Sequence, residues 1–359
     1  MHAHYKKKKI IVSEQETKLT HQRILITGGA GFIGSNLVEH FLQSNKVVCL
    51  DNLSTGFYKN IEEFVQNPNF SFIEGDINDL GTCQKAVKGS DYVFHQAALG
   101  SVPRSINNPI ATNASNIDGF LNMLVAARDE KVKRFIYAAS SSTYGDSKEL
   151  PKVEHRIGRP LSPYAITKYV NELYAHVFTQ LYGLETIGLR YFNVFGKRQS
   201  PEGAYAAVIP LWVKILLNHE SPIINGDGSF SRDFTYIDNV IQANELAAIT
   251  PWQNIIIQLK RYCTEMNLDK DPDQIFNIAY GGNTSLTELF MALRDNLAKH
   301  DKTVNQIEPI YGLNREGDIP HSQASIKKAK SIINYQPEID TRKGLEIVAG
   351  WYFENFRTL

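Results

Sequence analysis

The sequence predicts an α/β fold, in which a doubly wound parallel sheet is followed by a smaller mixed α/β lobe. Short apolar runs alternate with amphipathic helical patterns as far as residue 190, and this alternation is typical of a parallel sheet with helices on both faces. After Asn193 the pattern breaks into short pieces separated by Gly and Pro. We therefore expect a flexible lead over residues 1–20, a sheet domain over residues 21–193 and a second lobe over residues 194–359.

Six apolar runs are predicted to form the strands of this sheet. Short runs of this kind are typical of parallel strands that are buried on both faces. They cover residues 23–27, 47–51, 70–74, 92–96, 134–139 and 185–190. The helical patterns between them include residues 35–43, 110–130 and 164–182.

A glycine-rich turn follows the first predicted strand. Gly28 permits a tight turn, Gly31 lets backbone N–H groups approach a pyrophosphate, and Gly34 lets helix and strand pack closely. The N-terminus of the next helix then faces the phosphates. Asp51 ends the second strand 17 residues after Gly34, where a carboxylate can accept hydrogen bonds from a ribose. An acid at this point would repel a 2′-phosphate, so the pattern predicts NAD as the cofactor.

A tyrosine, a lysine and a run of serines form a second candidate site. Tyr164 and Lys168 are four residues apart in a predicted helix, so their side chains project from one face about one turn apart. An ammonium beside a phenol lowers the pKa of the tyrosine, which can then act as a general base. Ser140, Ser141 and Ser142 follow an apolar strand. Because ligands bind beyond the carboxyl ends of parallel strands, these hydroxyls are expected at the same rim as the glycine turn.

Three motifs together resemble the extended short-chain dehydrogenase/reductases, and more narrowly the NAD-dependent nucleotide-sugar epimerases. The motifs are Thr27-Gly28-Gly29-Ala30-Gly31-Phe32-Ile33-Gly34, Ser140-Ser141-Ser142-Thr143-Tyr144-Gly145 and Tyr164-x-x-x-Lys168. Further runs, such as Arg190-Tyr191-Phe192-Asn193 and Ser231-Arg232-Asp233-Phe234, are similar to those of UDP-N-acetylglucosamine 4-epimerases and their uronic-acid relatives. The likeness extends from about Gln22 to about Tyr352. It implies a Rossmann sheet to which a late segment of the second lobe returns.

The resemblance also implies roles for individual residues of this sequence. The implied catalytic set is Ser140, Tyr164 and Lys168. The implied NAD-binding residues are Gly28, Gly31, Phe32, Ile33, Gly34, Asp51, Asn52, Ser54, Thr55, Gly56, Asp76, Ile77, Gln96, Ala97, Ala98, Asn116, Tyr164, Lys168 and Tyr191. The implied residues for a UDP-sugar substrate are Gly100, Ser101, Ser141, Ser142, Asn193, Ala207, Val208, Asn225, Arg232, Arg315, Asp318 and Ser322. No metal site is expected.

The implied activity is epimerisation at C4 of a UDP-sugar through a 4-keto intermediate, with NAD that is not consumed. Related epimerases restricted to UDP-glucose and UDP-galactose often carry a tyrosine where this chain has the small Ser322. Room for an N-acetyl group favours UDP-GlcNAc and UDP-GalNAc, with UDP-glucose and UDP-galactose as further substrates. The alternatives are a UDP-N-acetylglucosaminuronate 4-epimerase, a nucleotide-sugar 4,6-dehydratase, a UDP-glucuronate decarboxylase and a non-catalytic NAD-binding regulator. A dehydratase needs an acid pair where this chain has Ser141 and Ser142.

Composition narrows the class of partner. The 38 basic and 38 acidic residues of the 359-residue chain balance, so neither nucleic acid nor an anionic membrane is an expected partner. Cys49, Cys83 and Cys263 are too scattered for a disulfide framework or a zinc site, which favours a reduced, cytoplasmic setting. No apolar run reaches the roughly 18 residues of a membrane span. The resemblance further implies a homodimer that pairs through the helices over residues 110–130 and 164–182.

Overall fold

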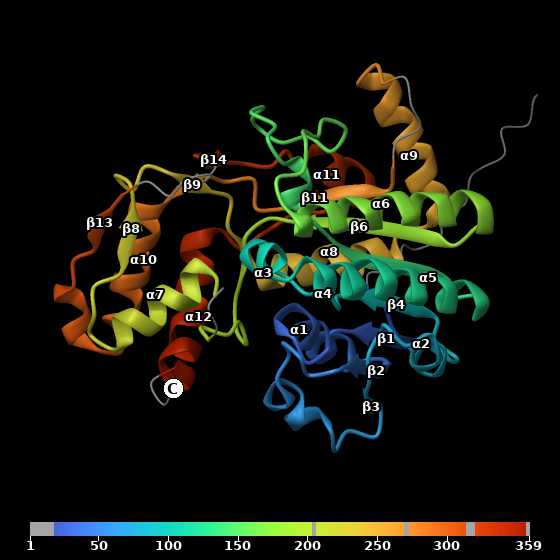
Figure 1. The fold of residues 1–359 in the computed structure, drawn as a ribbon, viewed down its shortest axis with the longest axis horizontal. Coiled ribbons are helices and arrows are strands. Elements are labelled where there is room, and N and C mark those ends of the chain that lie inside the picture. Colours follow the sequence, from blue (N-terminus) through green and yellow to red (C-terminus); the bar gives the residue numbers. More distant parts are fainter. Residues whose placement is uncertain (1–17, 203–205, 269–272, 314–319, 357–359) are drawn as a thin grey trace, which may run out of the picture.

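A seven-stranded parallel sheet forms the centre of the protein, in a computed structural model that describes residues 18–202, 206–268, 273–313 and 320–356 (Figure 1). The strand order is β11-β6-β5-β4-β1-β2-β3. The strands are β1 (Arg23–Thr27), β2 (Lys46–Asp51), β3 (Phe70–Glu74), β4 (Tyr92–His95), β5 (Arg134–Ser140), β6 (Glu185–Tyr191) and β11 (Ile275–Ile278). The α/β prediction is confirmed, and the six predicted strands form with every boundary within one residue of its expected place. The seventh, β11, comes from late in the chain and pairs with β6.

Helices cover both faces of the sheet, because alternate residues of a buried strand point to opposite sides. Ile24 and Ile26 of β1 join the apolar cluster that includes α1 and α8, whereas Leu25 joins the cluster built by α2, α5 and α6. The helices of this part are α1 (Phe32–Phe41), α2 (Leu80–Val87), α3 (Val102–Asn107), α4 (Pro109–Asn113), α5 (Gly119–Asp129), α6 (Pro163–Tyr182), α8 (Ile237–Ile249), α9 (Trp252–Glu265) and α11 (Lys327–Ile333), with short turns η1 (Tyr58–Asn60), η2 (Glu62–Phe64) and η4 (Ser141–Tyr144).

The helix predicted over residues 110–130 is interrupted. A π-helical turn, η3 (Ala114–Asp118), separates α4 from α5. Such turns are rare and are found mostly inside helices at functional sites. A hydrophobic periodicity does not reveal a single widened turn, so the sequence predicted one continuous helix.

A smaller lobe of short strands and helices lies beside the sheet, on the left of Figure 1. It is built around α7 (Val208–Leu217), α10 (Leu286–Leu297) and α12 (Thr341–Phe356), with the turn η5 (Lys302–Gln306). Its strands are β7 (Val194–Phe195), β8 (Ile223–Asn225), β9 (Ser231–Arg232), β10 (Thr235–Tyr236), β12 (Thr284–Ser285), β13 (Ile310–Gly312) and β14 (His321–Ser322). Its apolar residues continue the cluster on the α1 side of the sheet, so the two lobes share one core.

Cys49, Cys83 and Cys263 are all buried free thiols. Within the described ranges, none of the helices combines the length and apolar character that crossing a membrane requires. The same ranges contain no group of three or more His, Cys, Asp or Glu side chains placed to hold a metal ion.

Candidate active site

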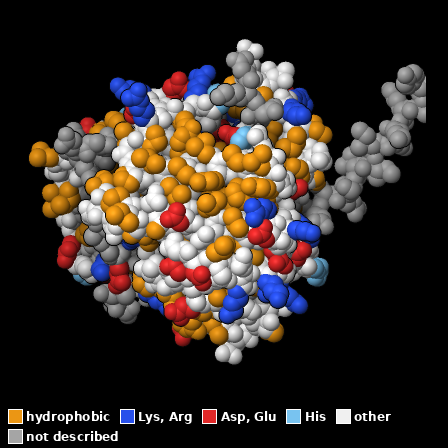
Figure 2. All heavy atoms as spheres, turned by 45° about the vertical axis from the view of Figure 1, so that its right-hand side comes forward, with side chains coloured by type: hydrophobic (Ala, Val, Ile, Leu, Met, Phe, Trp, Pro, Cys, Tyr) orange, Lys and Arg blue, Asp and Glu red, His pale blue; other side chains and the backbone are white. Residues whose placement is uncertain are grey.

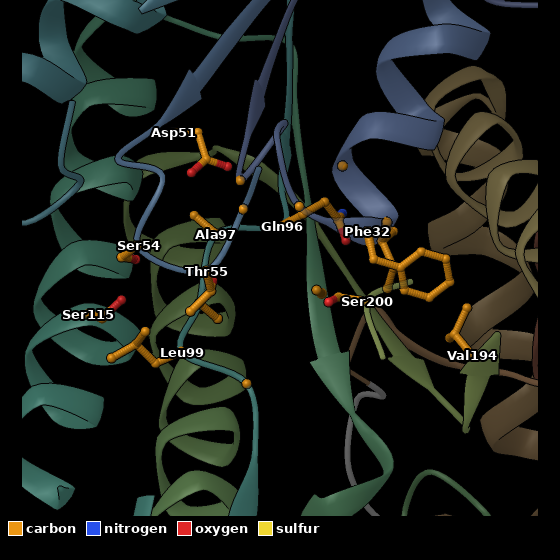
Figure 3. A pocket seen from close by; sticks show the side chains of 18 of the residues that line it. Phe32, Asp51, Ser54, Thr55, Gln96, Ala97, Leu99, Ser115, Val194 and Ser200 are labelled. Carbon is orange, nitrogen blue, oxygen red and sulfur yellow. The ribbon is translucent and has the colours of Figure 1, made fainter. Parts of the chain in front are cut away.

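A pocket of about 490 Å³ opens at the rim where the parallel strands end, between the sheet and the smaller lobe. Its wall includes the turn after β1, the ends of β2, β4, β5 and β6, and residues 206 and 207 just before α7. Asp51, Ser54 and Thr55 lie on one side of this pocket, and Phe32, Val194 and Ser200 lie on the other (Figure 3). This is the position at which open α/β sheets bind ligands.

The backbone of the glycine turn is closely packed against itself at the N-terminus of α1. Gly28 has a φ of 66°, and a Cβ added to Gly34 would lie 2.0 Å from the carbonyl oxygen of Gly28. The predicted helix start at residue 35 is wrong, because α1 begins at Phe32 with Gly31 as its N-cap. Gly34 therefore lies inside the first turn, whose N–H groups have no intrahelical partner.

The donors and acceptors of the pocket fit a dinucleotide. Phe32 and Ile33, at the positive end of α1, line the wall and can offer backbone N–H groups to a pyrophosphate. The Asp51 carboxylate accepts N–H bonds from Ala30 (3.0 Å) and Leu53 (2.8 Å), which fix it at the wall. A carboxylate has about four acceptor positions, so Asp51 can still accept a hydrogen bond from a ribose hydroxyl.

Local signals at both ends of α6 position the tyrosine and the lysine. Ser162 caps the helix by accepting the N–H of Ala165 at 3.1 Å, Pro163 occupies its first position, and Gly183 ends it with a φ of 71°. Tyr164 and Lys168 thus lie in the first two turns, and both side chains line the pocket.

Burial dominates the electrostatics of this pair. The Lys168 side chain donates to the carbonyl oxygen of Ala138 at 2.8 Å. Burial lowers the pKa of Lys168 to about 8, against an opposing contribution from the Glu172 carboxylate. Burial also raises the pKa of Tyr164, and a hydrogen bond with Ser140 offsets this only in part. Among the protein groups, burial therefore outweighs any lowering of the Tyr164 pKa, since a phenolate in this place loses hydration.

The three serines do not lie equivalently. Ser140 ends β5 and lines the pocket, and its hydroxyl accepts hydrogen bonds from the N–H (3.2 Å) and the hydroxyl (2.9 Å) of Ser142. Ser141 and Ser142 start the turn η4 and are not part of the pocket wall. The structure therefore brings Ser140, Tyr164 and Lys168 together at one wall.

Most residues expected to bind the cofactor line this pocket. They are Gly28, Gly31, Phe32, Ile33, Gly34, Asp51, Asn52, Ser54, Thr55, Gly56, Ile77, Gln96, Ala97, Ala98, Tyr164, Lys168 and Tyr191. Asp76 and Asn116 lie behind the wall. Asp76 accepts the side-chain N–H of Asn52 at 2.9 Å, and Asn116 accepts the backbone N–H of Leu99 at 2.8 Å. Each of the two therefore supports a wall residue.

The residues expected to bind substrate are more dispersed. Gly100, Asn193 and Ala207 line the pocket, Ser101 caps α3, and Val208 begins α7. Asn225, Arg232 and Ser322 lie on β8, β9 and β14, and the structure does not bring them to this wall. Arg232 and Ser322 are nevertheless register partners on adjacent strands. Arg315 and Asp318 lie outside the described residues.

Several wall residues were missed. Arg104, Ser115 and Gln199 line the pocket from α3, the π-helical turn and the loop after β7. The sequence does offer a signal for Arg104. It lies three positions after Ser101, which was expected in the site and caps the helix that carries Arg104. No sequence signal places Ser115 or Gln199 in the pocket. Ser115 depends on the π-helical turn and Gln199 on the course of the loop after β7, and hydrophobic periodicity reveals neither.

Comparison with known proteins agrees with the fold and with NAD as the cofactor. The NAD dependent epimerase/dehydratase family matches residues 24–255. The chain belongs to this family, and its cofactor is NAD. A UDP-N-acetylglucosamine 4-epimerase from Methanobrevibacter ruminantium, solved with UDP-N-acetylmuramic acid, is 36% identical with a TM-score of 0.82, covering 94% of this chain and 99% of that one.

Two further relatives act on other UDP-sugars. The UDP-glucose 4-epimerase of Thermotoga maritima, solved with UDP-glucose, is 33% identical with a TM-score of 0.79, covering 92% of this chain and 99% of that one. A UDP-glucuronate 4-epimerase from Thermodesulfobacterium geofontis is 31% identical over 93% of this chain and 97% of its own length. Similarity of this degree thus spans neutral, acetylated and uronic sugars.

Proposed function

We propose that this protein is a UDP-sugar 4-epimerase that interconverts UDP-GlcNAc and UDP-GalNAc. The observation that carries the proposal is the set of Ser140, Tyr164 and the buried Lys168 along the lining of an NAD pocket. The acetylated substrate is supported by the small side chain of Ser322 and by the similarity to the UDP-N-acetylglucosamine 4-epimerase of Methanobrevibacter ruminantium.

In the proposed reaction, Tyr164 as phenolate takes the proton of the sugar 4-hydroxyl, while the Ser140 hydroxyl hydrogen-bonds the same oxygen. NAD, held by the residues that line the pocket, would supply positive charge and a hydride acceptor and donor for C4. The Lys168 ammonium stabilises the phenolate by its charge. Tyr164 then returns the proton, so neither protons nor electrons are gained or lost overall.

The sugar has to turn over between the two halves of the reaction. We assign the hold on the diphosphate to Arg232 and Arg315, because planar guanidinium groups match phosphate oxygens. Asn193 and Ala207 lie where the pocket wall reaches the smaller lobe. We expect them to guide the sugar, with Tyr191 beside the nicotinamide.

The second candidate function is 4-epimerisation of UDP-N-acetylglucosaminuronate. Its support is the 31% identity to a UDP-glucuronate 4-epimerase over nearly the full length of both chains. The 4,6-dehydratase has less support, because the pocket wall carries Ser140 without an adjacent acid pair. A non-catalytic NAD-binding regulator would have no need of Tyr164 as a base.

The first test is to incubate the purified protein with UDP-GlcNAc, without added cofactor, and to separate the products by chromatography. The proposal expects a steady mixture of UDP-GlcNAc and UDP-GalNAc on NAD that remains bound. If no UDP-GalNAc forms even after NAD⁺ is added, the uronate substrate is tested next. A protein that binds NAD but turns over no UDP-sugar would instead favour the non-catalytic NAD-binding regulator.

We also propose a homodimer that pairs through the segment from α4 to α5 and through α6. Apolar side chains gather across the face that Figure 2 turns toward the viewer. Large apolar side chains are exposed on α6, with Leu181 at 70% and Leu173 at 50%, and Ile110 on the adjoining α4 is 82% exposed. Contiguous apolar surface of this kind marks interaction sites. Because α6 also carries Tyr164 and Lys168, pairing there would brace the catalytic helix.

A further inference from the structure

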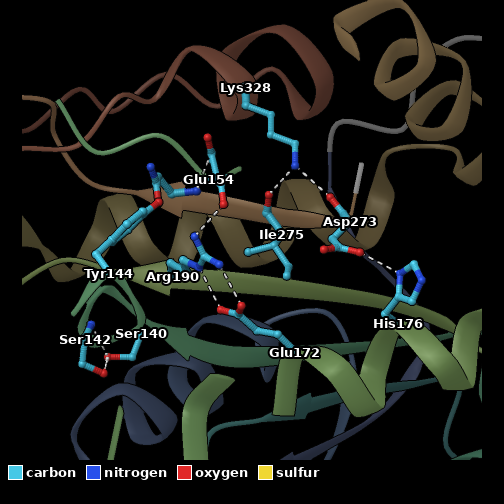
Figure 4. A network of polar contacts seen from close by, with 11 residues as sticks. Ser140, Ser142, Tyr144, Glu154, Glu172, His176, Arg190, Asp273, Ile275 and Lys328 are labelled. Carbon is cyan, nitrogen blue, oxygen red and sulfur yellow. Dashed lines mark hydrogen bonds and ion pairs between the residues drawn. The ribbon is translucent and has the colours of Figure 1, made fainter. Parts of the chain in front are cut away.

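The stripe of α6 that carries Tyr164 and Lys168 continues with a carboxylate. Glu172 follows Lys168 by four residues and so lies on the same face of the helix. It forms a two-pronged ion pair with Arg190 of β6, with N–O distances of 2.8 and 2.7 Å (Figure 4). Both side chains are only 3% exposed.

Arg190 joins this pair to the serine turn. Its guanidinium donates to the carbonyl oxygen of Glu154 at 3.0 Å and lies 4.8 Å from the centre of the Tyr144 ring. Tyr144 ends the turn that begins directly after Ser140, and its hydroxyl donates to Asn277 at 2.6 Å. One guanidinium therefore contacts both the helix of the base and the turn of the catalytic hydroxyl.

Stability alone does not account for a charge pair at this place. Removing two ions from water costs about as much as their attraction returns, and apolar pairs of similar volume often serve equally well. Lys168, in contrast, has a specific need. Its side chain is buried, and the hydrogen bond that it donates goes to a neutral carbonyl oxygen, that of Ala138. That hydrogen bond offers the ammonium no opposite charge. The Glu172 carboxylate, one helical turn away, does.

We propose that Glu172, held in place by Arg190, is a positioning residue that keeps the Lys168 ammonium charged beside Tyr164. This inference rests on the proposed function only in giving Tyr164 its role as base. Within the described residues, other titratable and charged groups near Lys168 and Glu172 are His95 on β4, Tyr137 on β5, Tyr144 in η4, Glu154 and, on α11, Lys328. His176 lies one turn further along α6 and forms an ion pair with Asp273 at 2.7 Å (Figure 4).

Three of these neighbours do not titrate near neutral pH. Burial lowers the pKa of His95 to about 3, so the imidazole is neutral. Burial raises the pKa values of Tyr137 and Tyr144, so both phenols are neutral. The Lys328 ammonium is turned away toward the carbonyl oxygens of Asp273 and Ile275 (Figure 4). We therefore assign an alkaline limb of the pH–rate profile near pH 8 to Lys168, whose pKa burial lowers to about 8.

The decisive variant is Glu172→Gln, which removes the charge and keeps the shape. Losing an opposite charge at this range lowers the lysine pKa by about one unit, so the alkaline limb moves from about pH 8 to about pH 7. The epimerisation rate then falls roughly fivefold at pH 8 but less than about twofold at pH 6.5. Glu172→Asp keeps the charge and is expected to retain the limb near pH 8.

A second readout does not require turnover. Acetic anhydride acetylates only the neutral form of an amine, and peptide mass spectrometry can follow acetylation of Lys168 against pH. Half-maximal labelling is expected near pH 8 in the parent protein and near pH 7 in Glu172→Gln. A labelling shift in a protein that epimerises no UDP-sugar would sink the proposed function and leave this inference standing.

The matched control is Glu185→Gln. Glu185 pairs with Arg134 at 2.9 and 2.7 Å, at the opposite end of the same strand β6. Glu185→Gln is expected to leave the pH–rate profile and the pH dependence of Lys168 acetylation unchanged. Glu172→Gln leaves Arg190 without its charged partner, so a second variant is needed in case the first folds poorly. The double variant Glu172→Gln, Arg190→Gln removes both charges, and the alkaline limb of its pH–rate profile should still lie at lower pH than that of the parent. An unmoved limb and unmoved labelling in either variant would overturn the inference.

Discussion

A single methyl group at Gly34 should disable the cofactor site. The Cβ of Gly34→Ala would lie 2.0 Å from the carbonyl oxygen of Gly28, 2.7 Å from its carbonyl carbon and 2.8 Å from the Cα of Gly29. Ordinary contacts are about 3.5 Å, so the turn has to move by more than about 1 Å. Overpacking of this kind costs about 1–3 kcal/mol, of which the better helix propensity of alanine returns at most about 1 kcal/mol.

Both consequences can be measured on the purified protein. We expect a lower melting temperature and a NAD content at least about tenfold below that of the parent, determined by chromatography after denaturation. Gly81→Ala is the matched control, because that Cβ finds its nearest neighbour, Asp79, at 3.5 Å in the first turn of α2. This control should retain NAD and the parent stability or slightly more. Full NAD content and an unchanged melting temperature in Gly34→Ala would refute the packing argument.

The remaining predictions concern the base, pH, the substrate and assembly. Tyr164→Phe should abolish turnover while NAD stays bound, and parent rates on UDP-GlcNAc would exclude Tyr164 as the base. In the parent protein, activity should fall as pH rises through about 8, because Lys168 is charged only below its pKa; a rate that stays flat to pH 9.5 or so would contradict this. Ser322→Tyr should reduce turnover of UDP-GlcNAc at least about tenfold and spare UDP-glucose, so equal rates on both sugars would count against the pocket hypothesis. Leu181→Glu should shift the mass seen by light scattering from dimer to monomer, and an unchanged dimer would place the interface elsewhere.

The sheet was predictable because parallel strands buried on both faces are nearly continuous apolar runs. Two features of the sheet domain were not predicted from the residues, and each has a physical reason. α1 begins at Phe32, but the glycines on either side of Phe32 and Ile33 make this stretch look like the end of a turn, since glycine is a poor helix former. β11 is a four-residue strand that follows the whole middle of the chain, and only the family resemblance indicated its return to the sheet.

The site was predictable where it follows the strand ends, and less so where tertiary contacts decide. The glycine turn, Asp51, Ser140, Tyr164 and Lys168 are all tied to a strand end or a helix start. The contribution of Ser115 depends on a widened turn. Arg190 did leave a sequence signal that was not used, because an arginine in an otherwise apolar buried strand is expected to have a buried partner.

The electrostatics of the pocket explain why that partner matters. Burial acts on Tyr164 and Lys168 in opposite directions, raising one pKa and lowering the other, and so it favours the neutral form of both. A working base needs the reverse, a phenolate beside an ammonium. The protein therefore has to supply charge from beyond the pair, and Glu172 is the carboxylate one helical turn from Lys168. Glu172 is only 3% exposed and accepts two N–H hydrogen bonds from the Arg190 guanidinium. Arg190 thereby holds the carboxylate one turn from Lys168, which makes the ion pair part of the proposed support of the base and accounts for its place against the catalytic helix.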